Sequence, residues 1–390
     1  MSAEVISLGC RLNLSESEDL RSLLAGEADL VVINSCAVTA EAVRQTRQAI
    51  RRARRARPEA RLLVTGCAAE VERAAIAAMP EVDGLIANTA KLDPRAWNVP
   101  PVRAALPGLH SRAFIAVQNG CNHACTFCVI PQGRGPSRSL AIAVVLHEVA
   151  RHLERGAREA VLTGVDLTSW GHDLPGAPAL GTLVAAILAE FPELTRLRLS
   201  SLDGIEIDPL LFELIACEAR VMPHVHLSLQ HGNDLILKRM KRRHLRGDAA
   251  ALVAALRARR PDLAVGADLI AGFPTESATA HTDNLSIIIE LGIVHGHVFP
   301  YSPRPGTPAA LMPQHSPAII KARAAQLRST IANVRAGWLG SLIGTPLAVL
   351  AERDGTGHAE NFARVQLPVE VSAGTVLTVI PTRIAEGLLA

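Results

Sequence analysis

The chain has 390 residues, a net charge of +3 and a hydrophobic content of 49%. Its length predicts two or three domains, because one ordinary domain takes about 100 to 200 residues. Its apolar runs all break before the ~20 residues that a membrane helix needs, so we expect a globular protein without membrane contact. The start MSAEVISLGC lacks a basic segment followed by an apolar stretch, which favours a cytoplasmic protein over an exported one. So small a net charge does not by itself indicate a polyanionic partner.

Seven cysteines are an odd number, and a reducing compartment disfavours disulfides. Regularly spaced thiols are therefore considered first as metal ligands. Six of the seven fall into two sets of three. The seventh, Cys217, lies in the apolar run LFELIACEAR, where we expect a core residue on a helix.

The first hundred residues repeat one pattern three times: a short apolar run, a polar or glycine pair, then a cysteine. The runs are EVISLGC, DLVVINSC and RLLVTGC, which end at Cys10, Cys36 and Cys67. Helix-like segments follow them, beginning near Ser15, Thr39 and Ala69. Strand and helix alternating in this way predict a parallel α/β sheet, in which ligands lie beyond the carboxyl ends of the strands. The three cysteines are thus expected at one edge of one sheet.

A loose, proline-bearing segment, WNVPPVRAALPGLHSR, runs from Trp97 to Arg112 and predicts a linker with a boundary near residue 105. Six strand-then-helix units follow, with the strands AFIAVQNGC, EAVLTGVDL, RLRLSSLDG, HVHLSLQHG, AVGADLIAGFP and GHVFPYSP. One helix is marked by a stripe at helical spacing, formed by Ile142, Val145, Val149 and Leu153. Six βα units predict a partial (β/α)6 barrel of the TIM type, whose sites gather after the strands.

The carboxyl-terminal part begins with a helical region near Lys321 to Ile343 and then changes to short strands. The strands are PLAVLAE, ARVQLPV and TVLTVIPTRI, separated by turn residues such as DGTG and SAG. They predict a small β-barrel of the OB-like kind. The α/β chain therefore divides into three predicted domains, 1–105, 106–336 and 337–390.

The strongest local signal is the C-x3-C-x2-C arrangement of Cys121, Cys125 and Cys128 in GCNHACTFCVIP. A 4Fe-4S cluster normally takes four thiolates, so three leave one iron open to an exogenous ligand. The alternative is a zinc site that His123 completes. Structural zinc usually pairs C-x2-C with a second well-spaced pair, which this loop lacks, and iron–sulfur ligation is favoured.

The motif GCNHACTFCVIPQGRGPSRS resembles the cluster loop of the radical S-adenosylmethionine superfamily, and in particular of its methylthiotransferases. LGCRLNLSESE, NSCAVT and TGCAAE are similar to the amino-terminal domain of these enzymes. RLSSLDG, LSLQHGND, DLIAGFPTE and VFPYSPRPGTP are similar to their later barrel signatures. The resemblance covers essentially the whole chain in the same order, and it implies that the carboxyl-terminal barrel is a short TRAM-like domain.

The resemblance implies two 4Fe-4S clusters and S-adenosylmethionine as cofactors. Cys121, Cys125 and Cys128 would hold the cluster whose open iron binds S-adenosylmethionine, which electron transfer cleaves to a deoxyadenosyl radical. The first set would hold an auxiliary cluster at which sulfur is methylated and then delivered. This set consists of Cys10, Cys36 and Cys67. Core packing is the alternative role for this set, although unrelated core cysteines have no reason to share a strand-end register.

The resemblance also places S-adenosylmethionine along the strand ends, which makes Gly164, Gly272 and Glu276 candidate contacts and assigns no catalytic side chain. Glycine permits a close backbone approach to a ligand, but tight turns explain both glycines equally well. His226 and His231 are candidates to line the site, although a satisfied interior histidine is the more common role.

Two basic segments are candidate phosphate contacts. Arginines recur at helical spacing at positions 44, 47, 51 and 55 with others beside them, and KRMKRRHLR spans Lys238 to Arg246. A solvated helix face is the ordinary explanation for such runs. The second run follows a barrel strand end, which favours it for RNA contact.

LGCRLN, GRGPSRS and SPRPGTP resemble the branch that acts on N6-threonylcarbamoyladenosine of tRNA. That branch implies the tRNA anticodon stem-loop as substrate, an electron donor such as flavodoxin or ferredoxin, and a monomer. The alternatives are methylthiolation of isopentenyladenosine tRNA or of a ribosomal protein. An alternative of another class is a noncatalytic RNA-binding protein braced by iron–sulfur clusters or zinc.

Iron and sulfide measurements on anaerobically reconstituted protein separate the radical enzyme from a zinc-braced protein. Two clusters predict about eight irons and eight sulfides per chain. A zinc-braced protein would instead retain zinc and take up no sulfide, which would contradict the radical assignment.

Overall fold

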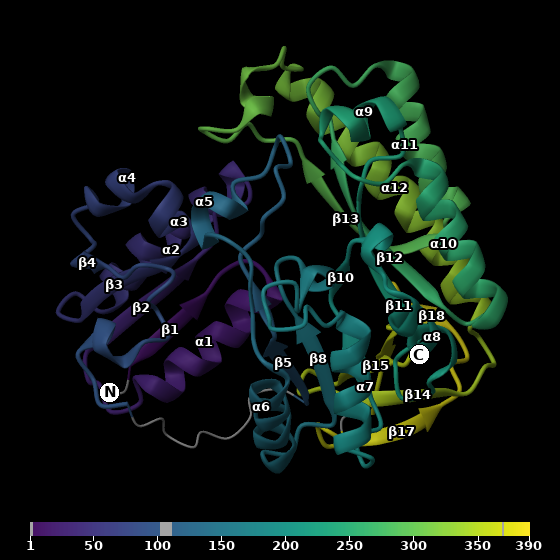
Figure 1. The fold of residues 1–390 in the computed structure, drawn as a ribbon, viewed down its shortest axis with the longest axis horizontal. Helices are drawn as coiled ribbons and strands as arrows, with labels where there is room; N and C mark the ends of the chain where they lie inside the picture. The colour runs from purple at the N-terminus through teal and green to yellow at the C-terminus, as the bar shows by residue number, and fades with distance from the viewer. Residues whose placement is uncertain (1–2, 102–110, 369) are drawn as a thin grey trace. The chain divides into compact units, whose positions relative to one another are not determined.

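The computed structural model describes residues 3–101, 111–368 and 370–390, and Figure 1 shows their helices and strands. The chain forms two compact units. The first, called the amino-terminal unit, comprises the described residues of 1–107, 119–138 and 302–311. The second, called the barrel unit, comprises those of 108–118, 139–301 and 312–390. Within the described residues, no helix combines the length and apolarity needed to cross a lipid bilayer.

The amino-terminal unit is built on a parallel four-stranded sheet in the order β1-β2-β3-β4. Its strands are β1 (Glu4–Ser7), β2 (Leu30–Ser35), β3 (Arg61–Gly66) and β4 (Gly84–Leu85). Ile33 of β2 pairs with Ile6 of β1 on one side and with Val64 of β3 on the other. The three predicted strands and their parallel pairing are confirmed.

Helices cover both faces of this sheet. They are α1 (Arg11–Leu23), α2 (Ala40–Ala56), α3 (Cys67–Val71), α4 (Arg73–Ala77) and the 3₁₀ helix η1 (Pro94–Trp97). Leu20 of α1 packs with Val32 on one face, whereas Val43 and Ile50 of α2 pack with Ile33 on the other. Burial of these aliphatic side chains supplies most of the driving force for folding this layer.

Two details of the amino-terminal prediction are corrected. Helix α1 begins at Arg11, four residues before the expected Ser15, because Cys10 already has the extended backbone of an N-cap residue. Trp97, expected at the start of a loose linker, is buried and donates its Nε1–H to the Lys91 carbonyl at 2.7 Å. Residues 102–110 of the predicted linker lie outside the described residues, and its last residue, Arg112, begins the strand Arg112–Ala116.

The barrel unit contains the six predicted βα strands, all pairing in parallel. They are β5 (Arg112–Ala116), β8 (Glu159–Thr163), β9 and β10 (Leu197–Leu199 and Ser201–Leu202), β11 (His224–Gln230), β12 (Ala264–Ala271) and β13 (Ile293–Pro300). The third strand is interrupted at Ser200, which divides the sheet into β5-β8-β9 and β10-β11-β12-β13. The short strands β6 (Gln118–Asn119) and β7 (Arg138–Ser139) flank the cysteine loop, which also holds α5 (Ile130–Arg134).

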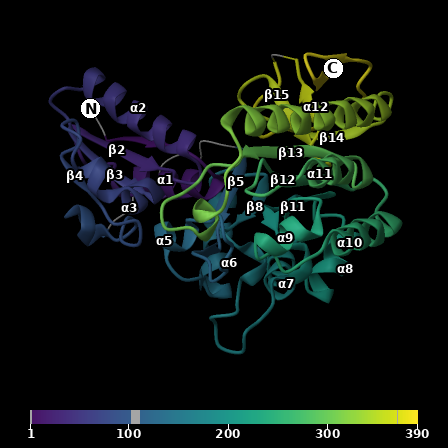
Figure 2. The same ribbon diagram turned by 90° about the horizontal axis from the view of Figure 1, so that it is seen from above.

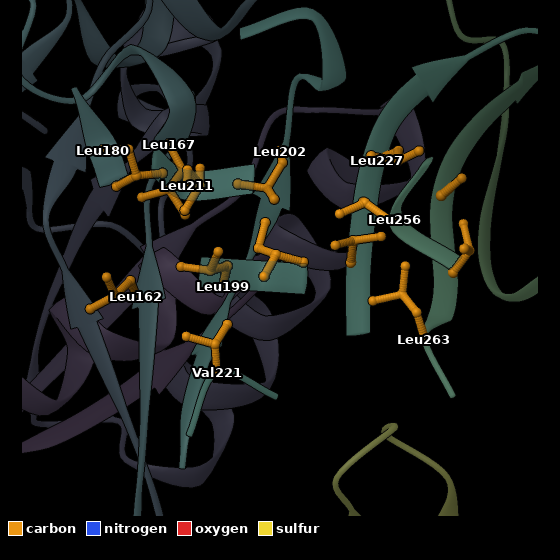
Figure 3. Packing of buried hydrophobic residues seen from close by; sticks show 14 of the residues in the cluster. Leu162, Leu167, Leu180, Leu199, Leu202, Leu211, Val221, Leu227, Leu256 and Leu263 are labelled. Carbon is orange, nitrogen blue, oxygen red and sulfur yellow. The ribbon is translucent and has the colours of Figure 1, made fainter. Parts of the chain in front are cut away.

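Helices follow the barrel strands and bury aliphatic side chains against them. They are α6 (Ile142–Glu154), α7 (Leu180–Glu190), α8 (Pro209–Cys217), α9 (Asp234–Arg239), α10 (Arg246–Arg259), α11 (Ala278–Glu290) and α12 (Pro317–Ser341). Short 3₁₀ helices complete the connections: η2 (Leu167–Ser169), η3 (Gly204–Glu206) and, in the amino-terminal unit, η4 (Pro308–Leu311). Figure 3 shows how leucines from strands and helices, among them Leu162, Leu180 and Leu256, meet in one core. The predicted stripe on α6 is confirmed, since Val145 and Val149 are fully buried.

The carboxyl-terminal strands form one six-stranded sheet, ordered β17-β14-β15-β16-β19-β18. They are β14 (Leu347–Ala351), β15 (Thr356–Ala359), β16 (Arg364–Gln366), β17 (Val376–Val379), β18 (Ile384–Ala385) and β19 (Leu388–Leu389). Strand β15 lies partly in DGTG, which was expected to be a turn. The preceding helix, α12, runs beside β13 (Figure 2) and begins at Pro317, capped by the Ser316 hydroxyl. The predicted α/β fold class, with its terminal β element, is confirmed.

A buried ion cluster joins this terminal sheet to the barrel strands. Glu159 of β8 accepts hydrogen bonds from Arg196 at 2.9 Å and from Arg198 at 2.9 and 3.2 Å. Both guanidinium groups also donate to backbone carbonyls of the carboxyl-terminal segment: Arg196 to Ala348 in β14, and Arg198 to Glu360, which follows β15. Burial alone would raise the pKa of Glu159, but Arg198 and Arg196 hold it well below its ordinary value.

The substitution Glu159→Gln should lower the free energy of unfolding by about 3 to 5 kcal/mol, since it leaves two buried guanidinium groups without a counter-charge. Urea unfolding at pH 7 measures the loss. The matched control is Glu213→Gln, which breaks an exposed ion pair with Arg259 and should leave the unfolding midpoint unchanged. Equal midpoints for both variants would contradict this account.

Candidate active site

Cys10, Cys36 and Cys67 lie at the carboxyl edge of the amino-terminal sheet. Cys36 and Cys67 follow β2 and β3 directly, and Cys10 comes three residues after β1 as the N-cap of α1. Because the strands are parallel and in register, their ends bring the three thiols to one edge. Cys10 is exposed and the other two are buried, each 7% exposed.

Two glycines allow this close approach. Gly9 has φ +97°, and a Cβ added there would lie 2.7 Å from the Cys36 Cβ and 2.8 Å from its Sγ. Gly66 has φ +90°, and its added Cβ would lie 2.5 Å from the Ser35 carbonyl oxygen. Any side chain at either position would force the segments that carry the cysteines apart.

The three thiols influence one another electrostatically. Burial, with a smaller contribution from the neighbouring Cys10 and Cys67, raises the pKa of Cys36 to about 11. Burial also raises the pKa of Cys67, against which Arg134 and Lys91 act in the opposite direction. Thiolates here would therefore need a strong positive partner, and iron in a cluster is such a partner. Three converging sulfur donors fit a three-thiolate iron–sulfur cluster.

The second set, Cys121, Cys125 and Cys128, lies in the loop between β6 and α5, and each is half-buried. The loop is closed at its base by a hydrogen bond from the Cys121 amide to the Gly135 carbonyl at 3.1 Å. Gly120 makes this closure possible, since its φ is +75° and an added Cβ would lie 2.0 Å from the Pro136 carbonyl oxygen.

Backbone amides already point at the sulfur atoms of this loop. The His123 amide lies 3.4 Å from Cys121 Sγ, and the Ile130 amide lies 3.4 Å from Cys128 Sγ. Such donors stabilise thiolates and tune the potential of a cluster that the thiolates hold. The loop therefore fits the iron–sulfur cluster expected from the spacing.

The structure places the three predicted S-adenosylmethionine contacts in the barrel unit. Gly164 directly follows β8 and faces Gln118, whose Oε1 would lie 2.9 Å from an added Cβ. Gly272 follows β12 with φ +72°, and its added Cβ would lie 2.7 Å from Ile320 of α12. Both glycines thus have a packing reason, and their contact with a cofactor stays a prediction.

Glu276 is almost fully buried and contacts its own loop and two other segments of the barrel unit. Its Oε2 accepts from the Gly272 amide at 2.6 Å and from Arg323 at 3.0 Å, and its Oε1 lies 3.2 Å from His231 Nε2. Burial raises the pKa of Glu276, but His231, His281 and Arg323 outweigh it and lower the pKa to about 2. The carboxylate holds the turn after β12 in place.

The expected interior role of the two histidines agrees with their surroundings. His231 is fully buried against Glu276, and His226 Nε2 lies 3.0 Å from Asp268 Oδ1. The expectation for Cys217 is wrong in one respect. It ends α8 as a helical residue but is exposed, with its Sγ 2.9 Å from Arg259, because it occupies the helix terminus rather than the buried stripe.

The basic run on α2 is largely neutralised by acids of the same unit. Five of its arginines form ion pairs: Arg44 with Glu41, Arg47 with Glu72, Arg51 with Glu81, Arg54 with Asp83 and Arg57 with Asp29. Arg52 and Arg55 remain exposed. In the second run Arg242 and Arg243 pair with Asp203, whereas Lys238 and Lys241 are exposed.

A group of buried polar residues beside the cysteines, centred on Glu16, Lys91 and Arg134, was not predicted from the sequence. One signal was available for Glu16. It lies four residues after Leu12 and four before Leu20, so it occupies the buried stripe of its helix. A charge on such a stripe indicates a buried partner.

Comparison with known proteins agrees with this geometry. Residues 2–87 match a family described as uncharacterized protein family UPF0004, and residues 115–281 match the radical SAM superfamily. The chain is 42% identical over 404 residues to the threonylcarbamoyladenosine tRNA methylthiotransferase MtaB of Rickettsia prowazekii (strain Madrid E), an alignment covering 99% of this chain and 96% of the relative. It is 31% identical to the tRNA-2-methylthio-N(6)-dimethylallyladenosine synthase of Chloroflexus aurantiacus, over 90% of this chain and 82% of that protein.

Solved structures of radical SAM enzymes share the fold. The radical S-adenosylmethionine methyltransferase TsrM from Kitasatospora setae superposes with a TM-score of 0.53 at 16% identity, covering 76% of this chain and 68% of its own. The cobalamin-dependent radical enzyme OxsB gives a TM-score of 0.52 at 9% identity, covering 85% and 56%.

The substitution Glu276→Gln tests the structural role of this carboxylate. Because its pKa falls from 4.5 to about 2 on folding, the ionised group stabilises the protein above pH 4.5, and the stabilisation is lost as the pH falls toward 2. The variant should unfold more easily at pH 7 by about 3 kcal/mol, and its difference from wild type should shrink below pH 4.5. Urea unfolding at stepped pH measures both, and a difference independent of pH would rule out this role.

Proposed function

We propose that this chain, which belongs to the family of threonylcarbamoyladenosine tRNA methylthiotransferases, adds a methylthio group at C2 of threonylcarbamoyladenosine beside the anticodon. The observation that carries the proposal is full-length identity of 42% to a relative of that name, combined with two three-cysteine sets in one unit. The dimethylallyladenosine relative is less similar, at 31% identity. Threonylcarbamoyladenosine is therefore preferred over isopentenyladenosine, and both of these relatives are named for tRNA rather than for a ribosomal protein.

The radical SAM superfamily uses S-adenosylmethionine and a 4Fe-4S cluster, and the residues that would hold this cluster are Cys121, Cys125 and Cys128. A second 4Fe-4S cluster on Cys10, Cys36 and Cys67 is part of the proposal, supported by their shared sheet edge. When bound, these groups supply reductive cleavage of S-adenosylmethionine and sulfur transfer.

The chain's own residues prepare these sites. The His123 and Ile130 amides stabilise negative charge on two of the loop thiols, and Gly9 allows Cys10 to approach Cys36. Glu276 holds the turn after β12 in place by accepting a hydrogen bond from the Gly272 amide. Gly272 and Gly164 are proposed backbone contacts for S-adenosylmethionine.

A tRNA substrate follows from family membership, and the anticodon stem-loop is the part proposed to bind. Lys238 and Lys241 are the favoured phosphate contacts, since they are exposed while most arginines of α2 have acidic partners. We place the enzyme in the cytoplasm as a monomer with three domains, 1–105, 106–336 and 337–390. Its electron donor would be a flavodoxin or a ferredoxin.

Mass spectrometry of tRNA nucleosides tests the function. Deleting the gene should abolish the methylthio derivative of threonylcarbamoyladenosine, and a gene carrying Cys125→Ala should fail to restore it, since that site would lose one of three ligands. The control Cys217→Ala removes an exposed cysteine outside both sets and should restore wild-type levels. Normal levels in the deletion strain would refute the proposed function.

A further inference from the structure

Three charged side chains form a buried cluster inside the amino-terminal unit, here called the Glu16 triad: Glu16, Lys91 and Arg134. Glu16 Oε2 accepts from Lys91 Nζ at 2.5 Å, and Glu16 Oε1 accepts from an Arg134 guanidinium nitrogen at 2.9 Å. A second Arg134 nitrogen lies 3.1 Å from Glu16 Oε2. Side-chain exposure is 2% for all three, so water does not screen these interactions.

The triad connects segments that carry the two cysteine sets. Glu16 lies on α1, six residues after Cys10, and Arg134 ends α5, six residues after Cys128. Glu16 and Arg134 are 118 residues apart in the sequence, and a bidentate contact joins their side chains. Bidentate guanidinium–carboxylate pairs fix orientation as well as distance.

Side-chain amides from three segments contact the triad. Arg134 donates to Asn13 Oδ1 at 2.5 Å and to Asn119 Oδ1 at 2.8 Å, and Lys91 donates to Asn34 Oδ1 at 3.2 Å. Asn13 precedes Glu16 by one helical turn, and Asn119 opens the cysteine loop. With these bonds the network fixes both ends of the loop segment that holds the second cysteine set.

The end of the loop packs directly against the first cysteine set. A Cβ added to Gly133, the neighbour of Arg134, would lie 3.3 Å from the Cys67 Cβ. Asn88 bridges the same two segments, since its Nδ2 donates to the Gly133 carbonyl at 2.6 Å and lies 3.9 Å from Cys67 Sγ.

Burial lowers the pKa of Lys91, and its ion pair with Glu16 acts in the opposite direction. With Lys91 protonated, the triad carries two positive charges and one negative charge, which leaves a surplus positive charge in a buried location. An unpaired buried cation is costly unless an anion lies close to it. The packing of Gly133 on Cys67 places that surplus beside thiol groups. Ligated as thiolates, the three cysteines of the sheet edge would supply the missing negative charge.

We propose that Glu16, Lys91 and Arg134 are positioning residues that fix the loop of Cys121 to Cys128 against the sheet edge of Cys10, Cys36 and Cys67 and supply positive charge to that edge. The triad touches neither substrate nor cofactor in this role. The part concerning charge rests on the proposed function, because it requires a cluster at the sheet edge. The part concerning the loop does not.

Hydrogen exchange in the full-length, anaerobically purified chain tests the fixing of the loop. The loop amides to follow are those of Cys121, Gly133 and Gly135, which are hydrogen-bonded within the loop. Arg134→Gln should accelerate their exchange by about 100-fold, as expected when a buried ion pair loses one partner. Arg134→Lys, which keeps the charge, should restore part of the protection.

The matched control for this measurement is Glu41→Gln, which breaks an exposed pair with Arg44 in the same unit. It should leave loop exchange unchanged. Wild-type exchange in Arg134→Gln would overturn the proposal, as would acceleration of equal size throughout the unit. If instead the wild-type enzyme modifies no tRNA, the proposed function is wrong. The hydrogen exchange rates of the loop amides still test whether the triad holds the loop in place.

Reduction potentials of the reconstituted chain separate positioning from plain packing. Removing a positive charge with Lys91→Met should lower the midpoint potential of the sheet-edge cluster, and removing the negative charge with Glu16→Gln should raise it. Glu41→Gln should not move it. Potentials equal to wild type in both triad variants, each loaded with two clusters, would contradict the charge role.

Discussion

The parallel, in-register pairing of β1, β2 and β3 is the constraint on which the rest of the site depends. It places Cys10, Cys36 and Cys67 at one sheet edge although they are far apart in sequence. Gly9 then lies so close to Cys36, and Gly66 so close to Ser35, that a side chain at either glycine would clash with the neighbouring segment. Hydrophobic layers on both faces bury the strands that carry the thiols, and such packing of the supporting elements preorganises a metal site.

Much of this architecture could be predicted from the sequence because it depends on local patterns. Short β-branched runs ending in cysteine predicted the three strands, and the C-x3-C-x2-C spacing by itself predicted an iron–sulfur loop. The stripe of Val145 and Val149 likewise predicted α6 correctly. The prediction that all of DGTG forms a turn was wrong, because its last two residues belong to β15. The pairing of β15 with β14 and β16 overrides the local turn preference of glycine and aspartate.

The Glu16 triad could not be predicted, because its members lie in three segments that only tertiary structure brings together. Arginines on α2 illustrate the same limit, since their spacing is equally compatible with an RNA-binding face and with ion pairs to acids on other elements. Sequence periodicity reports which face a residue occupies and not what lies opposite it. Burial and pairing therefore favour the exposed lysines of the second basic segment over the arginines of α2 as phosphate contacts.

Electron paramagnetic resonance of the anaerobically reduced full-length enzyme tests most directly whether both cysteine sets hold clusters within one unit. Two clusters packed in the same unit should give two signals that broaden one another, and Cys36→Ala should remove one signal and sharpen the other. A single signal that Cys36→Ala leaves unchanged would contradict a cluster at the sheet edge.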